Sequence, residues 1–311
     1  MRIATLACAM LSTSLLSATA LACNDGNCSL SPDAVGNERG SNGWHMNVQY
    51  QYQGSSPPRS ADNTPSPSGS AQLNSASHQQ TVSGGSVNRF LTLSLGQSTD
   101  SHWNFLARLP FTHGGHRLDT GLPSLALNPA PSVSSHGDIS LIGGYQGWLA
   151  NRNLGLQLGL KLPTADKVAN RGSGNTALII GSYYHQPFMQ HLDAFIGGRY
   201  LSSVRDNNHA GDADSRPANR SSMRVGFRYD GHPEVVPRLQ FNVIHSAHDQ
   251  GVLADHNNSG GTVVYLSPGM TLNPAASLQL YGFIQAPMYS DLTGSQPLPS
   301  WTATVGFGQA I

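Results

Sequence analysis

The sequence predicts an all-β fold, an antiparallel transmembrane β-barrel of about 12 strands with short periplasmic turns and long external loops. Three observations predict it. Apolar and polar residues alternate with a period of two in one stretch after another. The connections between these stretches alternate between short and long along the chain. The chain also starts with a segment that has the form of a secretory signal peptide.

Residues 1–22 are expected to be this signal peptide and no part of the fold. Arg2 supplies the positive start, an apolar segment follows, and Ala20-Leu21-Ala22 is an A-x-A cleavage site. No later run of about 18 apolar residues appears, so no transmembrane helix is expected. We therefore expect export through the secretory pathway to the outer membrane of a Gram-negative bacterium, with membrane lipid and the barrel-assembly machinery as partners.

Residues 23–42 are expected to be a periplasmic lead-in to a barrel of residues 43–311. Cleavage removes Cys8 and leaves Cys23 and Cys28. In an oxidising compartment the simplest expectation is a Cys23–Cys28 disulfide. Two alternatives stay open. Cys23 directly follows the cleavage site and is a candidate for lipid modification, and two thiols are also half of a metal site, although no histidine is near enough in the sequence to complete it.

Gly43 to Gln53 shows the alternation most plainly. Trp44, Met46, Val48, Tyr50 and Tyr52 fall on one face, and the residues between them are His, Asn and Gln. The length matches the roughly 9–11 residues that a tilted strand needs to cross a bilayer. Taken alone, a strand of this kind is better explained as one solvated face of a soluble sheet, because soluble sheets are common, so the prediction of a barrel depends on the pattern recurring.

The pattern does recur. From Leu154 to Leu162, leucine occupies every second position, and no helix places five leucines on one side at that spacing. The other predicted strands show the same alternation: Val87–Leu95, His102–Phe111, Asp138–Trp148, Thr176–His185, Leu192–Leu201, Ser222–Asp230, Arg238–His248, Thr262–Pro268, Leu278–Pro287 and Trp301–Phe307.

The connections support closure into a barrel. Long, polar connections are predicted at Gly54–Gly85, Thr112–Gly137, Thr164–Asn175, Ser202–Ser221, Asp249–Gly261 and Met288–Ser300. Between them fall the short connections Gly96–Ser101, Ala150–Asn153, Pro187–His191, Gly231–Pro237 and Thr271–Ser277. Outer-membrane barrels sort their connections in this way, and a soluble sandwich has no reason to do so.

If the leucine face contacts lipid, the opposite face lines the lumen, and its charges can be assigned. The basic residues expected inside are Arg108, Lys161, Arg199, Arg224, Arg228 and Arg238, and the acidic ones are Asp138, Asp193 and Asp230. The lumen is therefore expected to be polar and to favour anions mildly, because charged rings set the selectivity of pores. The alternative is that these groups pair across a filled barrel that conducts nothing.

Composition excludes other classes of function. The formal net charge is zero and only 11% of residues are charged, so no nucleic-acid partner is expected. The sequence holds 13 histidines, but the tightest cluster, His113-Gly-Gly-His116, offers two imidazoles without a third ligand. We therefore name His113 and His116 only as weak metal candidates and expect no cofactor.

Catalytic motifs are also missing. Ser-His dipeptides occur, but neighbours on a strand point to opposite faces and do not pair as nucleophile and base. Gly-x-Ser-x-Gly and His-Glu-x-x-His are absent. The sequence therefore predicts that the protein is not an enzyme.

Two segments carry a resemblance to a known family. Gly137-Asp138-Ile139-Ser140-Leu141 with Leu158-Gly-Leu-Lys-Leu-Pro-Thr164, and Leu280 to Asp291, resemble motifs of the outer-membrane barrel family named after the meta-cleavage pathway of phenol degradation. The resemblance covers most of residues 137–307, although Ala165 stands where glycine is expected and Ile311 where a terminal aromatic is usual. It implies passage of small, frequently hydrophobic compounds and no catalytic residues.

The sequence thus predicts a porin-like channel or transporter for small solutes, hydrophobic or anionic. Two alternatives stay open: a closed structural or binding barrel whose external loops engage a partner or a metal, and an outer-membrane hydrolase.

Overall fold

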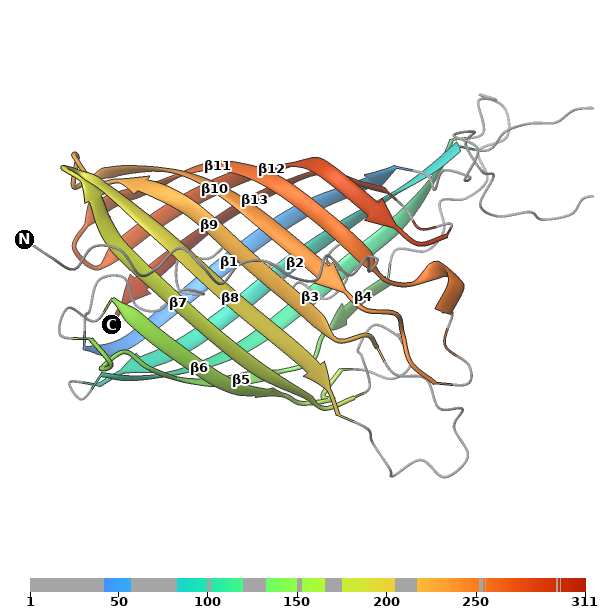
Figure 1. Cartoon of the computed structure of the whole chain (residues 1–311), viewed down its shortest axis with the longest axis horizontal. Helices are drawn as coiled ribbons and strands as arrows, with labels where there is room; N and C mark the ends of the chain where they lie inside the picture. The colour runs from blue at the N-terminus through green and yellow to red at the C-terminus, as the bar shows by residue number, and fades with distance from the viewer. Residues whose placement is uncertain are drawn as a thin grey trace, which may run out of the picture.

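The computed structural model describes residues 42–56, 83–99, 102–119, 133–149, 153–165, 175–204, 217–251, 254, 256–294, 296 and 298–311. These residues form one sheet that closes on itself as a barrel (Figure 1). The strands in chain order are β1 (Gly43–Ser56), β2 (Ser83–Ser98), β3 (Trp103–Asp119), β4 (Val133–His136), β5 (Ser140–Tyr145), β6 (Leu154–Lys161), β7 (Ala177–Met189), β8 (Leu192–Ser203), β9 (Arg220–Tyr229), β10 (Val235–Ser246), β11 (Gly261–Ala275), β12 (Leu278–Leu292) and β13 (Leu298–Ala310).

The barrel has twelve strand positions although thirteen strand segments are present, because β4 and β5 are two parts of one strand. Both segments pair antiparallel with β3. The break between them faces Pro110 of β3, whose carbonyl oxygen accepts a hydrogen bond of 2.6 Å from the Gly137 amide. Proline has no amide hydrogen to give to a sheet ladder, so the neighbouring strand is interrupted there.

Closure occurs between the first and last strands. β1 pairs with β2 on one side and with β13 on the other, with His45 opposite Ala310 and Tyr52 opposite Ala303. The predicted antiparallel barrel of about 12 strands is confirmed.

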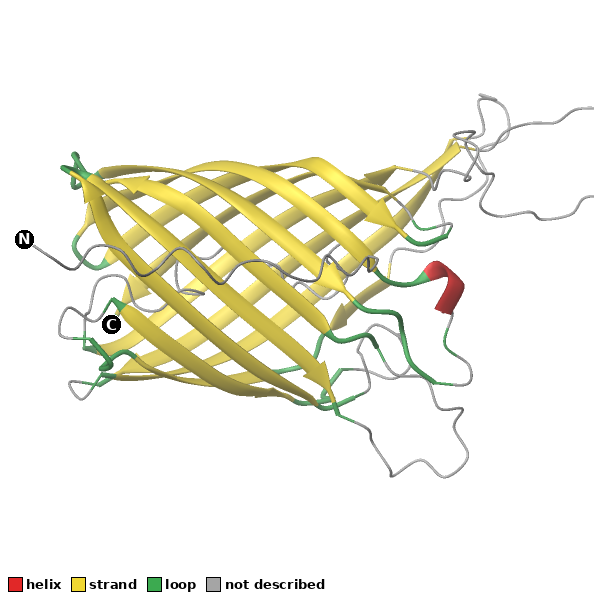
Figure 2. Cartoon of the chain, in the orientation of Figure 1, coloured by secondary structure: helices red, strands yellow, loops and turns green. Residues whose placement is uncertain are grey.

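As predicted, the short connections lie at one end of the barrel and the longer connections lie at the other (Figure 2). The end that holds the turns between β7 and β8, β9 and β10, and β11 and β12 is called the turn end, and the C-terminus lies there. The opposite end, called the loop end, holds the longer connections and η3 (His256–Asn258), the one helical turn among the described residues. The described residues include no helix that is long and apolar enough to span a membrane.

Two predicted loops are shorter than expected, because strand continues into them. β2 begins at Ser83 and β3 runs to Asp119, and the two strands stay paired up to these residues. This part of the hairpin is rich in Ser, Gly and His and shows no alternation of apolar residues. Backbone pairing alone satisfies its polar groups, so a search for an apolar face does not detect it.

The alternation predicted from the sequence sets the two faces of the wall. On β6, Leu156, Leu158 and Leu160 are exposed on the outside, whereas Gln157 and Lys161 are buried on the inside. On β1 the tryptophan and tyrosines lie outside, and Asn47, Gln49, Gln51 and Gln53 are no more than 3% exposed inside. The outer face therefore has the character of a surface that contacts lipid.

Aromatic side chains gather near both ends of the outer face. Close to the loop end, Tyr52 and Trp301 stack with ring centroids 5.2 Å apart. Close to the turn end, Tyr145 packs against Trp103 at 4.9 Å and against Trp148 at 5.9 Å. Aromatic girdles of this kind sit at the two membrane interfaces of outer-membrane barrels.

At the loop end, some connections are tied to one another. The Ala218 amide, before β9, donates a hydrogen bond of 2.8 Å to Asp249 Oδ1, after β10. Gln296 Nε2, before β13, donates to the Gly260 carbonyl oxygen at 2.7 Å. These bonds hold the segment between β10 and β11 against its neighbours.

The two faces predict opposite responses to a new charge. Leu93→Arg places a cation on the outer face of β2 and is expected to lower the free energy of unfolding by roughly 2–4 kcal/mol. Thr92→Arg places it inside, one residue away, and is expected to cost much less, because inward groups need not meet lipid. Urea titration of the protein folded into phospholipid vesicles measures both. Equal losses at the two positions would contradict the assignment of faces.

Candidate functional site

The inner face of the barrel, called the lumen wall, is the candidate site because it collects the charged side chains. Along β1, β2 and β13 the described inward side chains include no Asp, Glu, Lys or Arg and are mostly polar, with Phe90 as a buried apolar exception. There Tyr281 on β12 donates a hydrogen bond of 3.0 Å from its hydroxyl to Asn47 Oδ1. Charge lies elsewhere on the wall, on strands β3 to β10.

One ion pair closes the wall near the loop end of β5 and β6. Lys161 Nζ lies 3.3 Å from Asp138 Oδ2, and the side chains are only 5% and 1% exposed. Asp138 Oδ1 also accepts a hydrogen bond of 3.1 Å from the Ala165 amide, and Thr164 Oγ1 accepts one of 2.9 Å from the Ile139 amide. The two halves of the Gly137–Thr164 motif are therefore fastened together, and we call this arrangement the Asp138–Lys161 clasp.

A second ion pair lies toward the turn end. Arg228 on β9 donates a hydrogen bond from Nη2 to Asp193 Oδ2 on β8. Arg238 on β10 is directly opposite Arg228 in the sheet register and is buried. The two arginines and the aspartate therefore form one row across three neighbouring strands.

The remaining predicted arginines gather in the middle of the wall. Arg199 is opposite Ser222 of β9, and Arg224 follows two residues later on the same face. The Arg199 guanidinium is buried, and the positive charges of Arg108, from β3, and of Arg224 also act on it. β3 and β8 are separated by β5, β6 and β7 in the sheet, so these charges come from distant parts of the wall. We call Arg108, Arg199 and Arg224 the arginine group.

One further arginine joins this region although the sequence analysis missed it. Arg220 lies on the inner face at the start of β9, where its Nε donates a hydrogen bond of 3.1 Å to Ser246 Oγ on β10. It falls inside the range assigned to a long loop. Its even spacing from Arg224 and Arg228, which places all three on one face, is the signal that would have found it.

Asp230 is placed differently from the other acidic residues. It follows the last residue of β9 and lies in the turn, where it is half-exposed. Its Oδ1 is 3.6 Å from His191 Nδ1, which is also half-exposed, and its amide donates to the His191 carbonyl oxygen. It therefore lies beyond the wall strands, at the turn end of the barrel.

Some predicted site residues fall outside the described part of the chain. Cys23 and Cys28 do so, together with the signal peptide and the lead-in. His113 lies in β3 opposite Arg89, and the side chain of His116 is outside the described residues. Within the described residues, no group of three or more His, Cys, Asp or Glu side chains could hold a metal ion.

Large inward side chains lie on glycines of the next strand. A Cβ built on Gly155 would fall 2.1 Å from Tyr183 Cε1, and one on Gly306 would fall 2.4 Å from Tyr281 Cζ. In each case the covering residue is directly opposite the glycine in the sheet register. We call these contacts glycine seats: His45 over Gly96, Tyr183 over Gly155, Phe283 over Gly269 and Tyr281 over Gly306.

At each glycine seat, a bulky inward side chain lies along the wall, over the glycine of the neighbouring strand. Because glycine has no side chain, a ring on the neighbouring strand can lie flat against the wall. The ring then buries its surface on backbone and does not project toward the barrel axis. The seats cover one face of the Tyr183, Tyr281 and Phe283 rings, and all three side chains are buried.

The fold and the charged wall define the class: an outer-membrane type of barrel with a polar, mainly basic interior. No protein-family model matches the sequence, and no curated protein matches it significantly. The structure is similar to that of an outer-membrane channel from Pseudomonas putida F1, with 14% sequence identity and a TM-score of 0.63, over 91% of this chain and 100% of that chain. It also resembles a deltaS2S3 mutant of the monoaromatic hydrocarbon channel TodX, with 9% identity and a TM-score of 0.51, over 87% and 91% of the two chains.

The Asp138–Lys161 clasp makes a stability prediction. Asp138→Asn leaves the buried Lys161 ammonium without this carboxylate and is expected to lower the free energy of unfolding by about 3 kcal/mol. Asp138→Asn combined with Lys161→Met removes both charges and should recover most of that loss. Urea unfolding followed by the electrophoretic mobility shift of folded barrels measures all three proteins. A double variant as unstable as the single one would show that the ion pair is not the cause.

Proposed function

We propose that this protein is an outer-membrane channel for small anionic solutes. The observation that carries the proposal is the excess of basic side chains on the described lumen wall, where Asp138 and Asp193 face Arg108, Lys161, Arg199, Arg220, Arg224, Arg228 and Arg238. The apolar outer face and its aromatic girdles support insertion in the outer membrane. Export through the secretory pathway and assembly by the barrel-assembly machinery belong to the same proposal.

Electrostatics explains why the arginine group favours anions. Like charges that approach one another within a medium of low dielectric constant repel strongly. An anion that enters the lumen relieves the repulsion, so the group attracts anions and opposes cations.

The glycine seats support an open passage. An interior filled with side chains would bury them against one another across the barrel axis. Here four inward rings lie on the backbone of the adjacent strand, which keeps their bulk close to the wall. The seats therefore favour a channel over the closed structural or binding barrel that the sequence left open.

The resemblance to the meta-pathway barrel family supports small, frequently hydrophobic compounds as cargo. The two structures of similar fold are described as channels, one of them for monoaromatic hydrocarbons. The class of solute proposed here rests on this chain's own lumen wall. No catalytic residue is part of the proposal.

Ion selectivity tests the arginine group. In a planar bilayer under a KCl gradient, the reversal potential of the wild-type protein is expected to show a preference for chloride. Arg199→Gln combined with Arg224→Gln should lower the ratio of chloride to potassium permeability several-fold, because two of the three converging charges are lost. Arg89→Gln, which removes an exposed charge from the outer face of β2, is the matched control and should change nothing. A wild-type protein without conductance would overturn the proposed channel.

Conductance also tests the glycine seats. Gly155→Ala puts a methyl group where the Tyr183 ring lies, and the ring must swing toward the barrel axis. The single-channel conductance is expected to fall, whereas the folded fraction stays close to that of the wild type. Gly198→Ala is the control, since a Cβ there meets only the Ser222 carbonyl oxygen at 4.0 Å. An unchanged conductance in Gly155→Ala would mean that the seats do not shape the passage.

A further inference from the structure

Among the described side chains, the outer face of the wall carries one arginine and no lysine. Arg89 lies on β2, directly opposite Tyr52 on β1 and His113 on β3 in the sheet register. Its side chain is exposed, whereas the next residue, Phe90, is buried on the inner face. The other described Arg and Lys side chains belong to the lumen wall: Arg108, Lys161, Arg199, Arg220, Arg224, Arg228 and Arg238. Arg89 is therefore a cation on a face that is otherwise suited to lipid.

Arg89 lies beside an aromatic girdle. Tyr52, its neighbour on β1, stacks on Trp301 close to the loop end of the outer face. The Cβ atoms of directly opposite residues are about 4.5–5.5 Å apart, so the arginine side chain begins next to the stacked rings. An arginine on the lipid face is strongly destabilising at the bilayer midplane and nearly neutral near the interface. The girdle is thus a depth at which this residue is tolerated, and its guanidinium meets lipid headgroups there.

The charge on this part of the outer face is positive. The described outward side chains of β1, β2 and β3 include no Asp or Glu. His113, on the far side of Arg89 from Tyr52, is partly exposed and its imidazole is a second group that can donate a hydrogen bond. This surface is therefore complementary to an anionic headgroup.

The same strand presents an open apolar surface next to Arg89. Leu91, Leu93 and Leu95 follow at every second position toward the turn end and are 38%, 39% and 47% exposed. Successive outward residues of a strand are about 7 Å apart, so these leucines extend from the headgroup region into the hydrocarbon region. An acyl chain can lie along them while its headgroup reaches the guanidinium.

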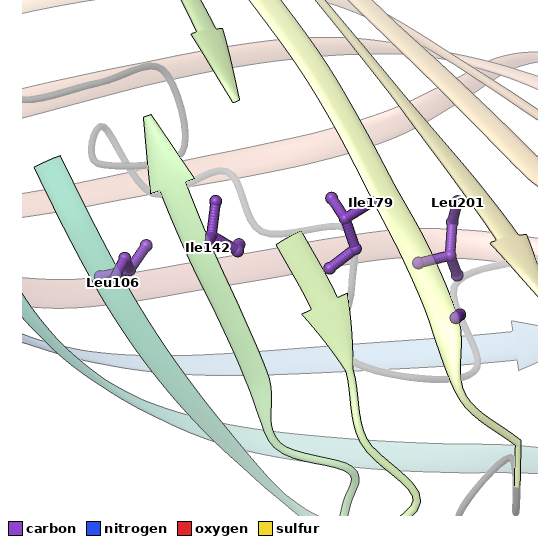
Figure 3. Packing of buried hydrophobic residues seen from close by; sticks show 5 residues of the cluster. Leu106, Ile142, Ile179 and Leu201 are labelled. Carbon is purple, nitrogen blue, oxygen red and sulfur yellow. The ribbon is translucent and has the colours of Figure 1, made fainter. Parts of the chain in front are cut away.

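The apolar residues of the inner face offer no such surface. Five inward side chains pack against one another and are at most 9% exposed (Figure 3): Leu106, Ile142, Ala177, Ile179 and Leu201. The leucines of β2, in contrast, keep more than a third of their surface open to a lipid.

A polar row farther along the wall differs in charge. His245 on β10, Thr262 on β11 and Asp291 on β12 are directly opposite one another on the outer face, and His245 Nδ1 lies 3.2 Å from Thr262 Oγ1. The Asp291 side chain is exposed. Its carboxylate opposes an anionic headgroup, so this row provides a control for the surface at Arg89.

We propose that Arg89 and His113, together with the leucines of β2, form a binding site for an anionic phospholipid in the leaflet at the loop end. The guanidinium makes a bidentate contact with the headgroup phosphate, a geometry that arginine favours. One acyl chain lies along Leu91, Leu93 and Leu95. This inference rests on insertion in the outer membrane, which is part of the proposed function, and is independent of the anion channel.

Native mass spectrometry of the full-length protein, freed of lipid in detergent, tests the site. Phosphatidic acid and phosphatidylcholine with the same acyl chains are added in turn, and the fraction of protein with one bound lipid gives each dissociation constant. The wild-type protein is expected to bind phosphatidic acid several-fold more tightly. Glycerol phosphate, the same headgroup without acyl chains, should not displace it. Equal affinity for the two lipids overturns the site, and displacement by glycerol phosphate shows a site for a free phosphate and overturns the lipid.

Variants locate the preference. Arg89→Gln should bring the ratio of the two affinities close to one, and Arg89→Lys should keep part of it, because lysine retains the charge without the planar fork. His113→Gln should lower the ratio, whereas His245→Gln, the matched control on the row with Asp291, should leave it unchanged. A full preference in Arg89→Gln, or an equal loss in the two histidine variants, overturns the location. If Arg89→Gln fails to fold, the wild-type comparison of the two lipids still decides the proposal.

A second copy of the chain is the other occupant that an exposed face of this kind accepts. The same spectra report the oligomeric state, and a wild-type dimer that becomes monomeric in Arg89→Gln would overturn the lipid site. The channel is judged separately. Chloride selectivity without a lipid preference overturns this inference alone, and a lipid preference in a protein that does not conduct overturns the channel alone.

Discussion

The structure depends on one constraint, that every backbone amide and carbonyl group of the wall must find its partner within the sheet. Lipid offers no hydrogen bonds, so the unpaired backbone groups of an open sheet edge would strongly destabilise the fold. The first strand must therefore pair with the last. The pairing of β1 with β13 satisfies this requirement, and the twist and pleat of the paired strands then send alternate side chains in and out. The outer face is left mainly to leucine and aromatic residues. Most of the described charged side chains of the wall are confined to the inner face.

Confinement to a narrow interior creates a problem of space that the glycines solve. A barrel of this strand number has room for either side chains or a passage, and large residues inside tend to fill it. Placing glycine directly opposite His45, Tyr183, Tyr281 and Phe283 gives these four rings a place on the wall itself. The same device operates in the buried cluster of Leu106, Ile142, Ala177, Ile179 and Leu201, where Gly159 accommodates Ile142. The inner face can therefore hold aromatic, apolar and basic groups close to the wall.

The sequence was sufficient for the features that depend on alternation. The apolar–polar alternation in the sequence predicted the two faces of β1 and β6. Together with the alternating short and long connections, it also predicted the closed barrel. Features without that signal were missed. The polar continuation of β2 and β3 has no apolar face, Arg220 lay within an assumed loop, and the inward isoleucines look the same as outward ones until the register assigns them. Asp230 has the right parity, but parity does not indicate where a strand ends.

The Asp138–Lys161 clasp shows that the sequence motif by which this chain can be recognised differs from the residues that line the rest of its interior. Its residues make up the most distinctive sequence motif, and their contacts are with one another and with backbone groups of the same corner. A motif of this kind specifies how two strands meet, so proteins that share it are expected to share a barrel. The members of the arginine group lie on β3, β8 and β9, outside the motif. Barrels with the same clasp can therefore differ in the side chains that line the rest of their lumen. A resemblance at the clasp indicates a shared architecture and does not identify a shared solute.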